Sequence, residues 1–290
     1  MSVTKKLLGR FDRYIGPALA VLGVALLVAE TRRPLRQRVA PRPRRWVRNT
    51  AVAAVALPGM RLALLPALLG LARAAERHHI GLLPKLRLPA PLRLGAELLV
   101  LDYVSYTWHR LLHSPLLWHF HLVHHLDEDM DLTTGWRFHA GEMLASVPYR
   151  GLLPALAGVR PGTVLLYEAL FEAETAFHHS NMRLPLALEQ ALAHVIITPR
   201  AHGIHHSQVR RETDSNYGVV LSLWDRLHQT LRLNVPQAAI TIGVPGYPEV
   251  PAQSLGTLLR LPLAAPRPWA GPDGTVPTRQ TQGSVTELAG

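Results

Sequence analysis

Apolar segments alternate along this chain with segments that are rich in arginine or histidine. Residues 14–30 form an apolar run near the lower limit of the roughly 17–25 residues that cross a bilayer, so we expect a helix that spans a membrane or lies shallow in one. Residues 50–75 form a second apolar segment, interrupted by Pro58, Gly59 and Pro66, and predict a kinked span. The pattern indicates an all-α, membrane-embedded protein.

The rest of the pattern predicts further helices. Residues 84–91 contain three prolines and read as a loop, and residues 92–113 predict a helix that becomes polar towards its end, as where a span leaves the membrane. Residues 143–177 are long enough for a helical hairpin that turns near residues 158–162. The Thr-Pro pair at residues 198–199 resembles an N-cap followed by proline at the first helical position.

Charge and composition refine this picture. The formal net charge is +11, and basic residues cluster beside apolar segments, which favours a membrane surface over nucleic acid as partner. The denser cluster lies within residues 31–49 and is expected in the cytoplasm. We divide the chain into an N-terminal anchor with an Arg-rich loop (1–49), a membrane-embedded catalytic domain (50–263) and a disordered tail (264–290).

The histidines are concentrated in one part of the chain. Of the sixteen, all except His78, His79 and His228 lie between residues 109 and 206. Residues three and four apart share one face of a helix, so each cluster is expected to project its imidazoles from a single side. Eight rings exceed the needs of one zinc site and suit two metals with open positions. The three clusters are HRLLH with His109 and His113, HLVHH with His121, His124 and His125, and HGIHH with His202, His205 and His206.

These three histidine boxes resemble the fatty acid hydroxylase superfamily of membrane di-iron enzymes, which includes sterol desaturases and sphingolipid hydroxylases. The resemblance runs from about Glu97 to Leu263 and includes RFHAGE, HHSNMRLP and TPRAHGIHHS, then the segment from Asp214 to Gly218 and the residues Leu223, Trp224 and Asp225. It implies an all-α, integral-membrane helical bundle with a histidine-rich di-metal site at its cytosolic face.

The resemblance also implies a set of site residues. Two iron ions would be held by histidines of the boxes and of the intervening segment, which adds His139 and His179 to the eight. Glu142 is an alternative supporting residue beside His139, and His178 is expected to pack beside the site rather than bind metal. Further residues that are expected to support the ligands are Asp102, Glu168, Glu172 and Asp214.

The implied reaction uses dioxygen to hydroxylate or desaturate a C–H bond of a lipid such as a fatty acyl chain, sphingolipid or sterol. The chain has no cysteine and no Gly-rich dinucleotide motif in a suitable setting, so a separate electron donor is expected, either a ferredoxin or a b-type cytochrome with its reductase. The expected location is a bacterial inner membrane, with the active site on the cytosolic side.

Some features leave alternatives open. Gly203, inside the third box where a larger residue is frequent, would widen the site, and RLHQT follows Asp225 where the family often has Phe-Gly-Thr. A membrane zinc hydrolase is an alternative, although neither HExxH nor HxxEH is present. A non-catalytic haem or metal carrier with paired histidines is the second. The lipid, the attacked carbon and the oligomeric state stay open.

Overall fold

The computed structural model describes residues 3–247 and 253–279, and within these ranges all regular elements are helical. The all-α prediction is therefore confirmed for the described part of the chain. The α-helices are α1 (Val3–Arg32), α2 (Arg42–Gly59), α3 (Leu65–Arg77), α4 (Ala90–Leu112), α5 (Trp118–His125), α6 (Ala140–Ala157), α7 (Pro161–His179), α8 (Leu186–Ala193), α9 (Pro199–His205), α10 (Arg210–Thr213), α11 (Leu223–Leu227) and α12 (Leu255–Arg260).

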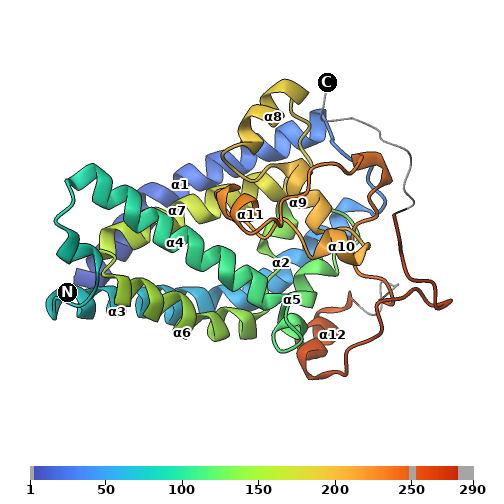
Figure 1. Ribbon diagram of the computed structural model, residues 1–290. Helices are drawn as coiled ribbons and strands as arrows, with labels where there is room; N and C mark the ends of the chain where they lie inside the picture. The colour runs from blue at the N-terminus through green and yellow to red at the C-terminus, as the bar shows by residue number, and fades with distance from the viewer. Residues whose placement is uncertain (1–2, 248–252, 280–290) are drawn as a thin grey trace.

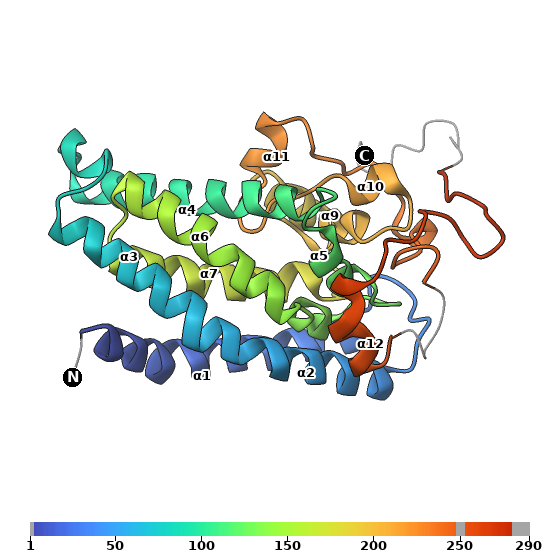
Figure 2. The same cartoon turned by 90° about the horizontal axis from the view of Figure 1, so that it is seen from below.

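The long helices α1, α2, α3, α4, α6 and α7 lie side by side, as Figures 1 and 2 show. The short helices α5, α9, α10 and α12 gather at one end of this bundle, opposite the end that holds the N-terminus (Figure 2). An apolar core fills the bundle between α3, α4 and α7 and includes Leu68, Leu69, Leu101 and Tyr167. A second core, with Val123 and Leu258, packs α5 against α12. The bundle thus forms a stem that carries the short helices at one end.

Two helical segments are long and apolar enough to cross a membrane, Phe11–Arg32 and Arg42–Arg77. The second combines α2, α3 and one π-helical turn, Met60–Leu64, which lies where the proline and glycine interruptions predicted a kink. Only 11% of the apolar window in the first segment is buried, and Val21 is 72% exposed there. Length and composition alone do not distinguish a span from a core helix, but this degree of exposure is typical of a surface that faces lipid.

The predicted hairpin is present as α6 and α7. The turn between them begins at Gly158, whose φ of +83° is a left-handed conformation that favours glycine and ends α6 as a C-cap. A Cβ at Gly158 would collide with the side chain of Pro84, so the same residue lets the loop before α4 approach the hairpin. The predicted N-cap is also present, since the Thr198 hydroxyl accepts a hydrogen bond from the Ala201 N–H at the start of α9.

Part of the segment expected to be a disordered tail contacts the rest of the protein. The Trp269 indole donates a hydrogen bond to the Gln208 carbonyl (2.8 Å), and Arg279 forms an ion pair with Glu212 (2.7 Å). Residues 280–290 of that predicted tail lie outside the described residues. The division into domains at residues 49 and 263 stays a prediction.

Candidate metal centre

The histidine boxes meet at the end of the bundle where the short helices gather. His109 lies in the last turn of α4 and His113 caps that helix, because HRLLH brings its two rings to one face. HLVHH forms most of α5, and HGIHH forms α9 together with its cap, His206. His179 enters from the last turn of α7. Four helices from three separate parts of the sequence therefore present their imidazoles to one another.

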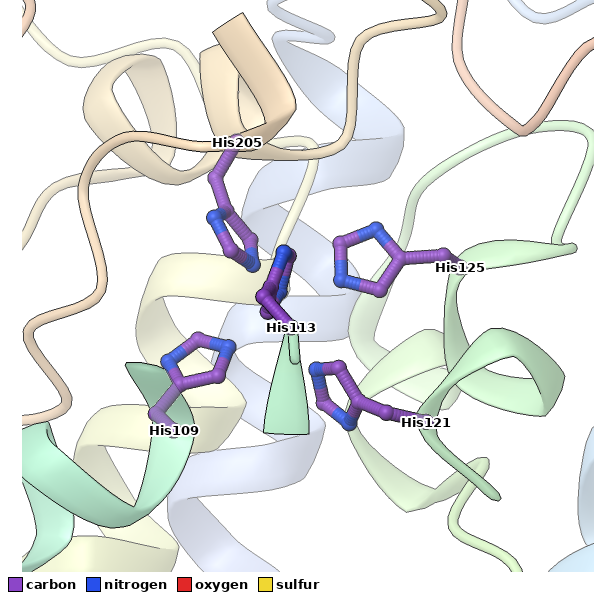
Figure 3. Close-up of side chains that lie close together, drawn as sticks. All are labelled: His109, His113, His121, His125 and His205. Carbon is purple, nitrogen blue, oxygen red and sulfur yellow. The ribbon is translucent and has the colours of Figure 1, made fainter. Parts of the chain in front are cut away.

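Five of these rings form the first group, which we call the five-His group. They come from α4, α5 and α9, and Figure 3 shows their rings turned towards a common centre. One nitrogen of each ring lies within 4.8 Å of the corresponding nitrogens of the others, and all five residues are buried. The members are His109, His113, His121, His125 and His205.

Backbone carbonyls fix the protonation of two rings in this group. His109 Nδ1 lies 2.8 Å from the Tyr217 oxygen, and His205 Nδ1 lies 2.7 Å from the Ser215 oxygen. A carbonyl oxygen only accepts, so Nδ1 carries the proton in both rings, and Nε2 keeps its lone pair. Both Nε2 atoms are buried and have no hydrogen-bond partner in the protein. Each ring is therefore set up to donate its Nε2 lone pair to a metal.

Carboxylates hold two further rings in the same way. His113 Nδ1 lies 3.3 Å from Asp214 Oδ1, and His121 Nδ1 lies 3.2 Å from Glu142 Oε2. Their Nε2 atoms are again buried without a partner. A carboxylate or carbonyl behind a ligating imidazole is the usual arrangement in metalloproteins, because it orients the ring and raises its basicity.

The second group, which we call the four-His group, consists of His124, His179, His202 and His206. His179 Nε2 lies 3.1 Å from Nε2 of His124 and 3.0 Å from Nε2 of His202, and the His206 and His202 Nε2 atoms are 3.2 Å apart. Neighbouring nitrogens that each bind one metal at about 2.0–2.1 Å are themselves roughly 3 Å apart. The spacing of the four rings thus fits one cation between them.

In the four-His group, fewer rings have a hydrogen-bond partner on their Nδ1 atom than in the five-His group. The Nδ1 of His179 donates to the Thr175 carbonyl (2.8 Å), but the Nδ1 atoms of His124, His202 and His206 are buried without a partner. Burial, and secondarily the neighbouring histidines, lowers the pKa of His202 and His206. Burial also lowers the pKa of His205 to about 3. The rings of α9 are accordingly neutral near pH 7, which is the form that binds metal.

The nine converging rings fit a pair of metal ions better than a purely structural role. A buried polar atom without a hydrogen bond costs about 1–3 kcal/mol, and every ring of the five-His group has a buried Nε2 of this kind. In the four-His group the Nε2 atoms contact one another. A metal accepts a lone pair from each ring. An all-imidazole donor set suits iron or zinc, and a separate group for each metal fits a dinuclear site.

His139, predicted as a ligand, lies outside both groups. It is the N-cap of α6, where its Nδ1 accepts a hydrogen bond from the Gly141 N–H (2.9 Å), and its Nε2 lies 3.2 Å from the Leu259 carbonyl. Both ring nitrogens are thereby engaged with backbone, so the geometry assigns this residue to capping. Its neighbour Glu142, which the sequence left as an alternative, reaches the site by supporting His121.

The four acidic residues expected to support the ligands divide into three roles. Asp214 contacts a ligand ring, as predicted. Asp102 instead accepts hydrogen bonds from the Tyr167 hydroxyl (2.9 Å) and the Trp224 indole (2.8 Å), and thereby ties α4 to α7 and α11. Glu168 and Glu172 contact no histidine of the centre in the described hydrogen bonds and line a cavity beside it.

The expectation that Gly203 widens the site is wrong. A Cβ at this position would collide with the guanidinium of Arg36, and the nearest atoms around it belong to Arg36 and Gln237 rather than to a histidine. Arg36 donates hydrogen bonds to the Pro199 carbonyl (3.2 Å) and to Gln237 Oε1 (2.5 Å). Glycine is therefore needed so that this buried arginine can fasten α9 in place.

The segment from Asp214 to Gly218 supports the centre through its backbone. Asn216 adopts a positive φ of 53° and donates from Nδ2 to the Ala201 carbonyl of α9 (2.7 Å). Asp225 accepts hydrogen bonds from the N–H groups of Tyr217 (2.9 Å) and Gly218 (2.7 Å). These contacts place the Ser215 and Tyr217 carbonyls behind the ligand rings. Apart from Asp214, the sequence marked this segment only as a motif, because backbone carbonyls leave no side-chain signal.

A cavity adjoins the centre on its bundle side. Its walls include rings of both groups, and the remainder is mainly apolar. His178, expected to pack beside the site, lines this cavity with its ring 4.0 Å from that of His202. A substrate in this cavity would lie against the two metal positions. Apolar side chains in its wall include Met60, Leu64, Trp108, Leu112, Phe138, Met143 and Phe171.

Comparisons with known proteins agree with this geometry. An ornithine lipid hydroxylase from Rhizobium tropici is 33% identical over 54% of this chain and 47% of its own length. Human alkylglycerol monooxygenase is 30% identical over 44% of this chain and 28% of its own, and a cholesterol 25-hydroxylase-like protein from Danio rerio is 31% identical over 48% and 55%. The chain thus spans about half or less of these relatives. No solved structure matches it.

A family match covers the residues that build the centre. Residues 95–230 match the fatty acid hydroxylase family, and this range contains all nine histidines of the two groups together with Glu142 and Asp214. The resemblance that the histidine boxes predicted is confirmed by this match and by the relatives. Over residues 95–230, somewhat less than half of its length, the chain is similar to the fatty acid hydroxylase family.

Proposed function

We propose that this protein is an integral-membrane oxygenase that hydroxylates a C–H bond of a lipid at a di-iron centre. The observation that carries the proposal is the convergence of nine buried imidazoles in two groups beside an apolar cavity. Its relatives are named as lipid hydroxylases and monooxygenases, which favours hydroxylation over desaturation as the outcome.

Two iron ions would be held by the five-His group and the four-His group. When bound, iron supplies the activation of dioxygen, of which one oxygen atom enters the C–H bond as an alcohol and the other leaves as water. The balance requires two electrons and two protons from outside. The described chain has no second redox group, and a separate ferredoxin or b-type cytochrome with its reductase is the proposed donor.

The chain's own residues perform the binding and positioning. Glu142 and Asp214 hold His121 and His113 at fixed angles, and the Tyr217 and Ser215 carbonyls do the same for His109 and His205. The apolar side chains of the cavity exclude water and orient an alkyl chain along the bundle. A substrate in the cavity would lie beside His109 of the five-His group and His202 of the four-His group.

The membrane location is part of the proposal. Helices α1 and α2–α3 supply two apolar segments of sufficient length, and side chains such as Val21 and Leu62, 72% and 80% exposed, lie on their outer faces. The Arg-rich segment that joins these helices would lie on the cytosolic side of a bacterial inner membrane. It lies at the same end of the bundle as the metal centre, so electrons would arrive from the cytosol (Figure 2).

Metal analysis and Mössbauer spectroscopy on detergent-purified protein expressed with excess iron test the proposal. We expect about two coupled irons per chain and consumption of oxygen that depends on added lipid and reductant. One zinc per chain without coupled iron would refute the proposal and favour the membrane zinc hydrolase. A haem absorption band would favour the metal-carrier alternative.

A further inference from the structure

The cavity beside the metal centre continues along one face of α7. Glu168, Glu172, Thr175 and His179 all line it, and their spacing of three or four residues places them in one row along the helix. At a rise of about 1.5 Å per residue, Glu172 lies about 10 Å and Glu168 about 16 Å from His179 along the helix axis. The inner end of the cavity therefore lies two to three turns from the metals.

This inner end carries charge in an otherwise apolar wall. Arg150 of α6 forms an ion pair with Glu168 (2.7 Å), and the two residues are 7% and 8% exposed. The Arg150 guanidinium also lies 4.8 Å from the ring centre of Phe171. Ionisable groups within an apolar bundle are costly and commonly mark a binding site, particularly where they face a cavity.

One carboxyl group of this cluster has no cationic partner of its own. Glu172 follows Glu168 by one helical turn. Burial, and secondarily the charge of Glu168, raises the pKa of Glu172 to about 7, against the opposing charges of Arg150 and Arg61. Arg150 is paired with Glu168, and Arg61 is paired with Asp12. Among the described cavity-lining residues, Arg150 is the single arginine and there is no lysine. The cluster thus contains one carboxyl group more than its cations balance.

We infer that Glu172, together with the Arg150–Glu168 pair, forms a subsite that binds the ammonium group of an amine-bearing lipid substrate. The inference rests on the proposed function, because it takes the cavity as the substrate site. A ligand ammonium would supply the missing positive charge, and its desolvation would be offset by an ion pair with Glu172 and a hydrogen bond to Glu168. The alkyl part of such a lipid would occupy the apolar wall towards the metals.

The test is a competition between two lipids that differ only in their polar group. Hexadecylamine, which is protonated at pH 7.5, and hexadecan-1-ol are added at equal mole fractions to micelles of the metal-loaded full chain, and bound lipid is measured by native mass spectrometry. We expect the wild-type protein to prefer the amine about tenfold, as one ion pair provides. Glu172→Gln should bring the ratio close to one without changing the metal content.

Glu174→Gln is the matched control. Glu174 lies on the same helix but does not line the cavity, so this variant should keep the preference for the amine. If the wild-type protein binds amine and alcohol in a ratio near one, the inference is overturned, and no variant is needed. An unchanged amine-to-alcohol ratio in a Glu172→Gln protein that retains its metals also overturns it. Failure of the proposed function shows differently, as an absence of oxygen-dependent lipid oxidation while the binding preference persists.

Discussion

Two buried polar clusters adjoin α5, and they differ in how their polar atoms are satisfied. One is the metal centre, whose ring nitrogens are in large part left without protein partners. The other is a network that we call the Arg45 network, in which charged groups bind one another. Its members are Arg45, Asn49, Asp127, Asp131, Thr134 and Arg137, none more than 1% exposed.

The Arg45 network satisfies its charges within the protein. Arg45 binds both carboxylate oxygens of Asp127 (2.8 and 2.7 Å) and reaches Asp131 with its third nitrogen (2.7 Å). Burial alone would raise the pKa of Asp127, but Arg45 and Arg137 lower it below the ordinary value. Arg137 also donates to the Val123 carbonyl in α5 (2.7 Å). The network therefore anchors the helix that carries His121, His124 and His125.

This difference distinguishes a buried polar cluster that stabilises the fold from one that binds a ligand. A buried polar cluster whose donors and acceptors match needs no further group and serves to hold elements together. A cluster of equal burial whose lone pairs converge without donors requires a ligand, here a cation. Removing residues from the two clusters should consequently affect different properties.

The largest expected effect is on activity, in the metal centre. His205→Ala or His124→Ala removes one lone pair from the five-His or the four-His group and should lower bound metal and reduce lipid oxidation by more than about a hundredfold, since loss of a mere supporting residue already costs 10–100-fold. Metal content and product formation are measured together. His78→Ala, outside both groups, should change neither, and full activity in both box variants would contradict the assignment.

The next effect is on stability, in the Arg45 network. Arg45→Met leaves Asp127 buried without its main partner and should reduce the free energy of unfolding by about 3–5 kcal/mol. Thermal unfolding of the metal-loaded protein measures the change. Arg48→Met is the matched control, because its pair with Glu128 is partly exposed and should contribute at most about 1 kcal/mol. If both variants lose the same free energy of unfolding, the Arg45 network contributes no more to stability than the partly exposed Arg48–Glu128 pair.

The smallest effect concerns a residue that supports a ligand. Asp214→Asn weakens the hydrogen bond behind His113 and should lower metal affinity of the five-His group by about 10–100-fold, with little change in unfolding. Titration with a chelator measures this affinity, and the variant should lose one metal at a lower chelator concentration than the wild-type protein. Asp273→Asn, an exposed residue, serves as control. If Asp214→Asn releases metal no sooner than the control, the carboxylate does not support the ring.

The sequence by itself determined the helices and the chemistry of the centre. Apolar periodicity, the proline interruptions and the Thr198 cap are local signals, so the kinked α2–α3 segment, the α6–α7 hairpin and the start of α9 follow from neighbouring residues. The three boxes likewise identify eight of the nine rings that meet, although the expectation that each box projects its rings from a single side holds only for HRLLH. The residue type of the donors, imidazole, therefore required no tertiary information.

Only the tertiary structure decided how the rings divide between the five-His group and the four-His group. His125 and His124 are adjacent in sequence but belong to different groups, because successive residues of a helix point about 100° apart and meet different partners. The capping role of His139, the burial of Arg36 and Arg45 and the placement of Glu168 and Glu172 in the cavity are also invisible in the sequence. Each depends on contacts between residues far apart in the chain, which local pattern cannot encode.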